Sequence, residues 1–208
     1  MPELDYIFDP ATSAYMKSDA FSSAAILVKR AFAWIFSRTA AESAAASTTG
    51  VLGAVTDNGS DRDITTGFTN PPCPRNITVT FGGTATDVKA VVVTVYGTNI
   101  NDADISETFT ATVNTADTKT GNKAFKTVNR VTIPAHDGTG ATTAVGFGDK
   151  LGLPMLLSEN TNFRTHLGGA LEGTAATVAM SSSALESNTI DLNSALNGTA
   201  VKAWFLTA

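Results

Sequence analysis

The chain has 208 residues and a formal net charge of −5. Its Lys and Arg residues are scattered, so it lacks the basic patch that phosphate neutralisation requires, and we expect no nucleic-acid partner. Charged residues make up 16% of the chain, below the usual share of about a quarter. The composition is typical of strands and polar turns, and the length suits one sizeable domain or one domain with an appendage.

The start of the chain, MPELDYIFDP, is acidic and lacks the basic region of a secretory signal peptide. Cys73 is the single cysteine, which excludes an intrachain disulfide. The apolar run 24–36 is interrupted by Lys29 and Arg30 and is too short to span a bilayer. We therefore expect folding in a reducing cytoplasm and no membrane partner.

Residues 1–50 predict an extended arm followed by a helix. The stretch 18–47 is rich in Ala and free of Gly and Pro, and its apolar residues recur at the 3-4-3 spacing of one helical face. A helix this apolar must pack on its own domain, on a second subunit or on another protein. Deleting residues 1–50 is then expected to leave a folded domain that no longer joins its assembly. The candidate subunit or capsid interface is Tyr6, Phe8, Phe21, Val28, Phe32, Trp34, Ile35 and Phe36.

From residue 51 to 208 the pattern changes to short β-branched runs separated by Gly- and Asn-rich turns, which predicts about eight strands. Crossover helices are missing, which argues against a parallel α/β enzyme. We predict a mainly β fold, an antiparallel β-sandwich of Ig-like or jelly-roll-like type. The segment 158–173 is expected to be a long loop or a short helix. The expected strands are 75–83, 87–99, 106–113, 123–134 (a pair or one bent strand), 141–148, 174–181, 187–193 and 199–208. The expected turns are 82–83, 99–104, 121–122, 137–138 and 197–198.

The string GFGDKLGLP, residues 146–154, superficially resembles a phosphate-binding loop. A P-loop requires Gly-Lys-Ser/Thr and a following helix, whereas here Asp149 precedes Lys150 and a proline closes the string. We predict a glycine bend between two strands instead. Asp149 and Lys150 would lie at its exposed tip, and Leu151 and Leu153 would return to the core.

Candidate catalytic and metal-binding residues are few. His136 and His166 are the only histidines, and His136 is expected to be a solvated turn residue. Cys73 is flanked by prolines and has no helix N-terminus to activate it. The run 57–63 contains three carboxylates without EF-hand spacing, so we favour a polar turn and leave a calcium or magnesium ion open. We expect no catalytic residues, no cofactor and no metal.

Four motifs lie between residues 70 and 154, and a fifth string, LNSALNGTAVKAWFLTA, closes the chain. Together they resemble a group of tailed-bacteriophage virion proteins, over about half of the chain. Residues 101–106 depart from the pattern, because a Gly expected near Asp104 is absent. The matching residues are Asn70, Pro71, Pro74, Arg75 and Asn76; Gly97, Thr98, Asn99, Glu107 and Thr108; 123–128; and 146–154.

The resemblance implies a non-enzymatic structural protein of the virion, and within the virion it favours a capsid decoration or cement protein. It implies a symmetric oligomer, with a trimer favoured, and partners among other virion proteins, above all the major capsid protein. Such a chain would assemble in the bacterial host cytoplasm.

Two alternatives stay open. The first is a neck, tail or fibre module, including one that binds a receptor or glycan through exposed aromatics. Few aromatic residues follow residue 130, and two of them, Trp204 and Phe205, are expected in a core strand, which weakens this alternative. The second alternative is a small hydrolase.

Overall fold

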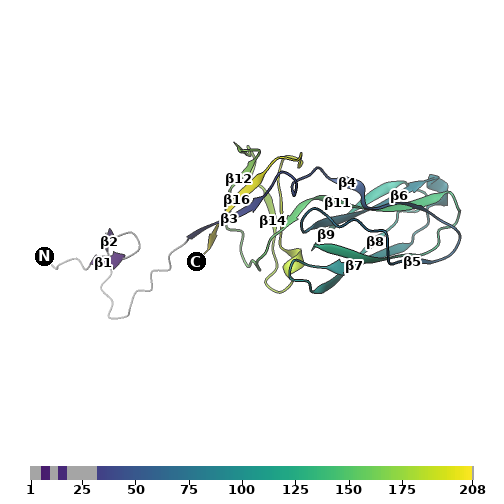
Figure 1. Cartoon of the computed structure of the whole chain (residues 1–208), viewed down its shortest axis with the longest axis horizontal. Helices are drawn as coiled ribbons and strands as arrows, with labels where there is room; N and C mark the ends of the chain where they lie inside the picture. The colour runs from purple at the N-terminus through teal and green to yellow at the C-terminus, as the bar shows by residue number, and fades with distance from the viewer. Residues whose placement is uncertain (1–5, 10–13, 18–31, 208) are drawn as a thin grey trace. The chain divides into compact units, whose positions relative to one another are not determined.

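A computed structural model describes residues 6–9, 14–17 and 32–207 of the chain (Figure 1). The chain divides into two compact units at residues 32 and 33. In the first unit, β1 (Tyr6–Asp9) and β2 (Ala14–Lys17) form an antiparallel hairpin in which Phe8 pairs with Tyr15. The predicted extended arm is therefore a hairpin over these residues.

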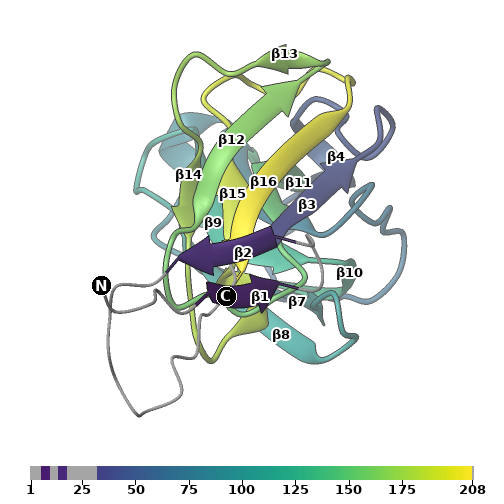
Figure 2. The ribbon, with the colours of Figure 1, turned by 90° about the vertical axis from the view of Figure 1, so that its left-hand side faces the viewer.

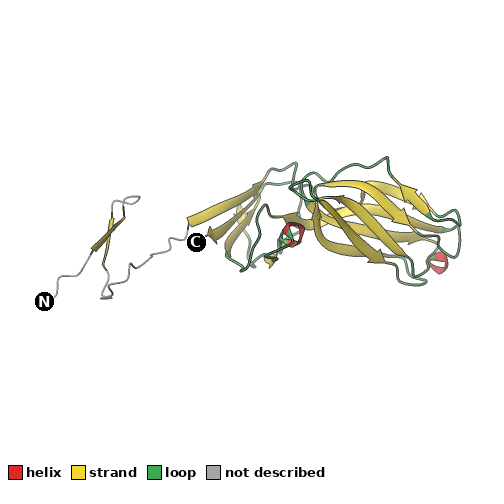
Figure 3. Ribbon diagram, turned by 90° about the horizontal axis from the view of Figure 1, so that it is seen from below, coloured by secondary structure: helices red, strands yellow, loops and turns green. Residues whose placement is uncertain are grey.

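Within residues 33–207, the second unit is built from three β-sheets and two short 3-10 helices (Figure 3). The first sheet has the order β5-β10-β7-β8, the central sheet has the order β14-β15-β11-β6-β9 with β4 also beside β11, and the terminal sheet has the order β13-β12-β16-β3. The pairings with a described register are antiparallel, which confirms a mainly β, antiparallel fold.

The bounds of these elements are as follows. The first sheet contains β5 (Arg62–Ile64), β10 (Thr127–Ile133), β7 (Val92–Thr98) and β8 (Asp104–Thr110). The central sheet contains β14 (Thr177–Ala179), β15 (Thr189–Asp191), β11 (Ala141–Gly152), β6 (Arg75–Gly83), β9 (Asp117–Phe125) and β4 (Ser47–Thr56). The terminal sheet contains β13 (Ala170–Leu171), β12 (Asn162–Leu167), β16 (Val201–Thr207) and β3 (Phe32–Arg38). The helices are η1 (Ala85–Asp87) and η2 (Leu185–Ser187).

The larger core lies between the first sheet and the part of the central sheet that faces it. Val93 and Val95 of β7 are buried there while Val92 is exposed, as the two-residue period of a strand requires. Val79 and Phe81 of β6 are buried from the opposite side. Each such side chain contributes about 1.5–3 kcal/mol of burial free energy. Two sheets packed over one core give this part of the unit a sandwich-like form.

A second core lies between the end of β11, the neighbouring β15 and the terminal sheet. Leu151 and Leu153 pack there against Ile190 of β15 and against Phe36 and Phe205 of the terminal sheet. Strand β11 therefore serves both cores, and Figure 1 shows its ribbon running from one region to the other. Leu151 and Leu153 are buried as predicted.

The predicted N-terminal helix is wrong over the residues that the structure describes. Residues 32–38 form β3, a turn follows, and β4 begins at Ser47. The remainder of the predicted helix, 18–31, lies outside the described residues. Residues 33–50 belong to the same compact unit as the rest of the chain to Thr207. Deleting residues 1–50 would therefore remove β3 and the buried Phe36, contrary to the expectation that a folded domain would remain.

Other sequence-based predictions vary in outcome. Strand 75–83 is confirmed with its predicted bounds as β6. The segment 158–173 is neither a plain loop nor a helix, because it contains β12 and β13. The pair Gly121-Asn122 lies inside β9, where the pairing with β6 shifts register, so the predicted turn is a bulge.

The string 146–154 also differs from the prediction. Residues up to Gly152 belong to β11, and the register with β6 shifts between Phe147 and Leu151. The bend between two strands is therefore a bulge within one strand, and Asp149 and Lys150 are only partly exposed.

Candidate functional site

A buried arginine fixes the bulge of β11. The side chain of Arg75 is 0% exposed. Its Nε donates to the Gly148 carbonyl oxygen at 2.7 Å, its Nη1 donates to that of Ala44 at 2.5 Å, and its Nη2 lies 3.2 Å from Asp149 Oδ1. The guanidinium stacks on the Phe147 ring, 4.7 Å from the centroid. Burial lowers the pKa of Arg75, and Cys73 and Asp149 oppose the shift.

Asn76 holds the other side of the same bulge. Its amide nitrogen donates to the Gly121 carbonyl at 3.2 Å, and its Oδ1 accepts from the Lys150 backbone N–H at 3.0 Å. A Cβ at Gly148 would lie 2.6 Å from the Asn76 amide, so a side chain is excluded there. The residues of the GFGDKLGLP string are therefore held in place by hydrogen bonds with Arg75 and Asn76, and we call this group of contacts the joint.

Glu107 clasps the bulge in β9. Its carboxylate accepts from the backbone N–H groups of Asn122 at 2.7 Å and Lys123 at 3.3 Å. Burial raises the pKa of Glu107, and these two hydrogen bonds oppose the shift. A raised carboxyl pKa often marks a catalytic acid, but both oxygens here serve the backbone of a neighbouring strand.

Two further motif residues also make internal contacts. Asn99 Oδ1 accepts from the backbone N–H groups of Asn101 at 2.9 Å and Ala103 at 3.2 Å, which closes the loop between β7 and β8. Asn70 Oδ1 accepts from the Val128 N–H at 3.0 Å. The side chains of both motif residues thus accept hydrogen bonds from backbone N–H groups of the same chain.

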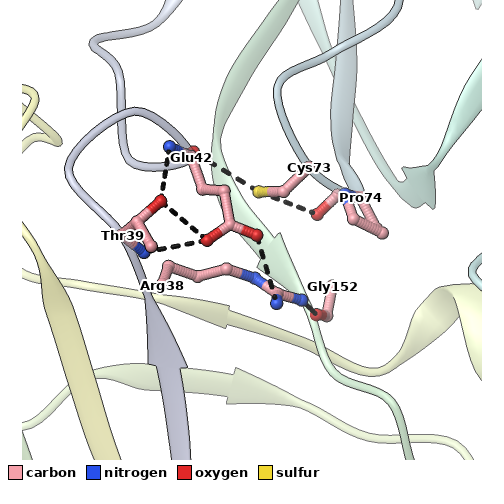
Figure 4. Close-up of polar contacts among 6 residues, drawn as sticks. All are labelled: Arg38, Thr39, Glu42, Cys73, Pro74 and Gly152. Carbon is pink, nitrogen blue, oxygen red and sulfur yellow. Dashed lines mark hydrogen bonds and ion pairs between the residues drawn. The ribbon is translucent and has the colours of Figure 1, made fainter.

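The group of polar residues that most resembles a catalytic site surrounds Cys73 (Figure 4). The Cys73 thiol donates to the Glu42 backbone carbonyl at 3.4 Å, and the Glu42 carboxylate accepts from the Thr39 N–H and hydroxyl, both at 2.9 Å. Arg38 lies 3.7 Å from Glu42 and donates to the Gly152 carbonyl at 3.4 Å. Burial raises the pKa of the Cys73 thiol, so it remains a thiol rather than a nucleophilic thiolate.

His136 is buried, which corrects the expectation of a solvated turn residue. Its Nδ1 accepts from the Lys89 N–H at 3.1 Å, and its Nε2 lies 3.4 Å from the Thr143 hydroxyl. Burial lowers its pKa, and Asp57 and Asp137 partly oppose the shift. The ring is therefore a neutral structural group at pH 7.

The three carboxylates of the 57–63 loop are engaged separately. Asp57 accepts from the Gly59 N–H at 3.1 Å, Asp61 accepts from the Ala135 N–H at 2.9 Å, and Asp63 lies 4.0 Å from Arg130. Among the described residues, His, Cys, Asp and Glu side chains do not gather in groups of three or more as metal ligands would.

The terminal sheet presents a different kind of surface. Figure 2 shows β3, β16, β12 and β13 side by side. Successive side chains of β3 and of β16 point to opposite faces of the terminal sheet. Phe36 and Phe205 therefore enter the second core, while Ile35 (51% exposed) and Leu206 (43% exposed) project from the opposite face. We call this opposite side the outer face. The apolar part of the outer face consists of Ile35, Leu206 and Leu171; Leu171 is 62% exposed and pairs with the outer-face residue His166.

The remainder of the outer face carries basic and aromatic side chains. Arg164 pairs with Trp204 in the strand register, and His166 pairs with Lys202. A cleft of about 360 Å³ is lined by His166, Gly169, Ala200, Lys202 and Trp204. Trp204 is thus half-buried on the outer face of β16, a strand that lines the second core with Val201, Ala203 and Phe205, as predicted.

The predicted interface residues are separated by this arrangement. Phe36 is 2% exposed in the chain's own second core, and Trp34 packs beside it and against Phe205 at 5.5 Å between ring centroids. Ile35 is on the outer face. Tyr6 and Phe8 belong to β1 and Phe32 begins β3, while Phe21 and Val28 lie outside the described residues. The outer-face residues Arg164, Lys202 and Leu206 were missed by the sequence analysis, although the alternation VKAWFL already separates the two faces of β16.

Comparison with family models, with curated proteins and with solved structures finds no match to this chain. Within the described part of the chain, no helix has the length and apolarity needed to cross a membrane.

Proposed function

We propose that this chain is a non-enzymatic structural protein of a tailed-bacteriophage particle that decorates or cements the capsid. It would bind the head shell as a symmetric oligomer, with a trimer favoured and the major capsid protein as its main partner. The proposal includes the finer fold class, an Ig-like or jelly-roll-like sandwich.

The motif residues that carry the resemblance make hydrogen bonds within the fold. Arg75, Asn76, Asn99 and Glu107 are motif residues, and each bonds to backbone groups of a neighbouring segment. A motif made of such residues specifies a scaffold, because its side chains are consumed by internal contacts. A scaffold of this kind supports the proposed structural role.

The observation that carries the docking part of the proposal is the apolar part of the outer face. Ile35 and Leu206 are large aliphatic side chains exposed on adjacent strands of one sheet. Burying such side chains against a partner contributes about 1.5–3 kcal/mol each when burial is complete. An apolar centre with polar surroundings is the usual anatomy of a protein interface.

The test compares particle occupancy for three full-length proteins: wild type, Ile35→Asp/Leu206→Asp, and Val113→Asp. Val113 is 53% exposed in the loop after β8 and serves as a matched control. We expect at least about tenfold lower occupancy for the double variant and wild-type occupancy for the control, since a buried carboxylate is strongly unfavourable at an interface. Full occupancy of a folded double variant would refute this docking surface.

The predicted role of the N-terminal segment requires a different truncation from one at residue 50. A chain beginning at Phe32 keeps β3 and the second core. We expect this truncated chain to fold and to join particles less well than the full chain, if the first 31 residues contact the shell. Unchanged occupancy would remove the segment from the proposal.

A second candidate function is a neck, tail or fibre module that binds a receptor. The observation that favours it is the position of Trp204, which lines an open cleft instead of lying in the core. Low copy number in the particle would favour this candidate over decoration.

A further inference from the structure

The cleft on the outer face combines an aromatic ring with basic side chains. Trp204 and Lys202 come from β16, His166 from β12, and Gly169 and Ala200 from the adjoining loops. Its volume of about 360 Å³ lies at the lower end of the range for ligand sites, roughly 300–1,000 Å³. A ligand that fits it is small, or is one unit of a larger chain.

Within the described part of the chain, the basic side chains at and beside this cleft have no acidic partner. Among the described residues, the ion pairs within 4.0 Å involve neither Arg164 nor Lys202. Both belong to adjacent strands of the outer face, in a chain whose net charge is −5. Lys202 lines the cleft, and Arg164 lies beside it over Trp204. Two cations without an ion-pair partner in the described part of an acidic chain favour an anionic ligand at this position.

His166 orients the arginine. Arg164 Nε donates to His166 Nε2 at 2.7 Å, and His166 Nδ1 lies 3.2 Å from the Gly169 carbonyl oxygen. Because arginine can only donate, Nε2 must be the acceptor and Nδ1 carries the proton toward Gly169. The guanidinium also lies over Trp204, 5.6 Å from the ring centroid. Holding Nε in this way leaves both Nη groups of Arg164 available for a carboxylate.

The backbone around the cleft argues against an extended acidic peptide as the ligand. Strands β12 and β16 are interior strands of the terminal sheet, since β12 pairs with β13 and β16, and β16 pairs with β12 and β3. Their ladder groups are already used, so a peptide could not add a strand in the cleft. A ligand here must bring its own polar groups and a flat apolar surface for the ring of Trp204.

From these observations we propose that the cleft binds an acidic saccharide, a pyranose ring that carries a carboxylate. The ring packs on Trp204, and the carboxylate binds Lys202 and Arg164. This inference goes beyond the decoration role and rests on the second candidate function, receptor binding, for which it names the ligand class at the same cleft.

The experiment uses the full-length protein with Trp34→Phe, which leaves Trp204 as the one tryptophan reporter. The probes are tetragalacturonate and N-acetylneuraminate, with neutral methyl galactoside and hexaglutamate for comparison. We expect saturable fluorescence changes with at least one acidic saccharide, at a Kd of roughly millimolar order, weakening with added salt. Isothermal calorimetry on the wild-type protein provides a readout that does not depend on tryptophan.

Variants separate the cleft from non-specific attraction. Lys202→Met and Arg164→Met should each weaken binding by about tenfold, because each removes a charged hydrogen bond to the carboxylate. Lys89→Met is the matched control, since Lys89 is an exposed lysine of another surface paired with Asp137, and it should bind as wild type.

Several outcomes would overturn the proposal. They are no saturable binding of either acidic saccharide up to roughly 50 mM, equal binding of methyl galactoside, stronger binding of hexaglutamate, or unchanged affinity in Lys202→Met. Because particle occupancy is not measured in this assay, its failure leaves the proposed structural function standing.

Discussion

The substitution Arg75→Ala tests the buried joint between the two cores most directly. The guanidinium satisfies the carbonyl oxygens of Gly148 and Ala44 and pairs with Asp149, while its side chain stacks on Phe147. Each buried carbonyl left without a donor costs about 1–3 kcal/mol. Removing one partner of a fully buried ion pair typically costs about 3–5 kcal/mol, and this pair belongs at the low end because the Asp149 side chain is 29% exposed. These two contributions overlap, so we expect the free energy of unfolding to fall by about 4 kcal/mol.

Urea denaturation followed by tryptophan fluorescence measures this loss. For a chain of this size, about 4 kcal/mol corresponds to a fall in Tm of roughly 8–16 °C. Arg75→Lys should recover only part of the loss, because one ammonium cannot reach three acceptors that lie in different directions.

Arg130→Ala is the matched control for this experiment. Arg130 stacks on Tyr96 at 3.8 Å and lies 4.0 Å from Asp63, but its side chain is 42% exposed. We expect a loss below about 1 kcal/mol, as for most surface pairs. If Arg75→Ala cost no more than this control, the joint would not be a main determinant of stability and the reasoning would be wrong.

Three further predictions concern packing, pH and thiol chemistry. Gly146→Ala should lower Tm markedly, because a Cβ would overlap the backbone of β4, whereas Gly53→Ala meets nothing within 4 Å and should leave Tm nearly unchanged. The low pKa of His136 means that the unfolded chain binds a proton below pH 6.5 that the native chain does not. The free energy that His136 contributes to stability is therefore fully present above pH 6.5 and is lost as the pH falls toward the native pKa. The urea midpoint of His136→Gln should decline less over this pH range than that of the wild type. An equal decline in both proteins would exclude His136 as its source. Cys73 should resist iodoacetamide in the native protein and react once unfolded, by mass spectrometry, since burial keeps it as a thiol; rapid native labelling would contradict its assignment.

The sequence was informative where one period dominated. The run 75–83 alternates and is β-branched, and it forms β6 with the predicted bounds. The helix prediction failed because the same apolar residues satisfy two periods. Trp34 and Phe36 alternate with Ile35 as in a strand, while Phe32 and Ile35 keep a helical spacing. Packing against the second core decided between them, and no local pattern contains that core.

The joint around Arg75 could not be derived from local patterns. Its partners at Ala44 and Gly148 are 31 and 73 residues away along the chain. The glycines of the 146–154 string did indicate an irregular backbone, but glycine alone does not distinguish a turn between strands from a bulge within one. Similarly, His136 was assigned to solvent from its loop context, and only the fold shows that Lys89 and Thr143 enclose it.

The outer face could be predicted only in part from the sequence. Ile35 was predicted at an interface and lies on the outer face, but it belongs to a strand, whereas the prediction placed it on a helix. The cleft requires β12 and β16 to be neighbours, and β12 lies in a segment expected to be irregular. Without that strand, Arg164 and His166 could not be placed opposite Trp204 and Lys202.

Quantitative mass spectrometry of purified virions tests the proposal that this chain is a structural component of a phage particle. The decoration role predicts on the order of hundreds of copies per particle, as expected for a protein that follows the symmetry of a shell. About a dozen copies or fewer would favour the neck, tail or fibre candidate. Absence of the chain from purified particles would contradict the claim.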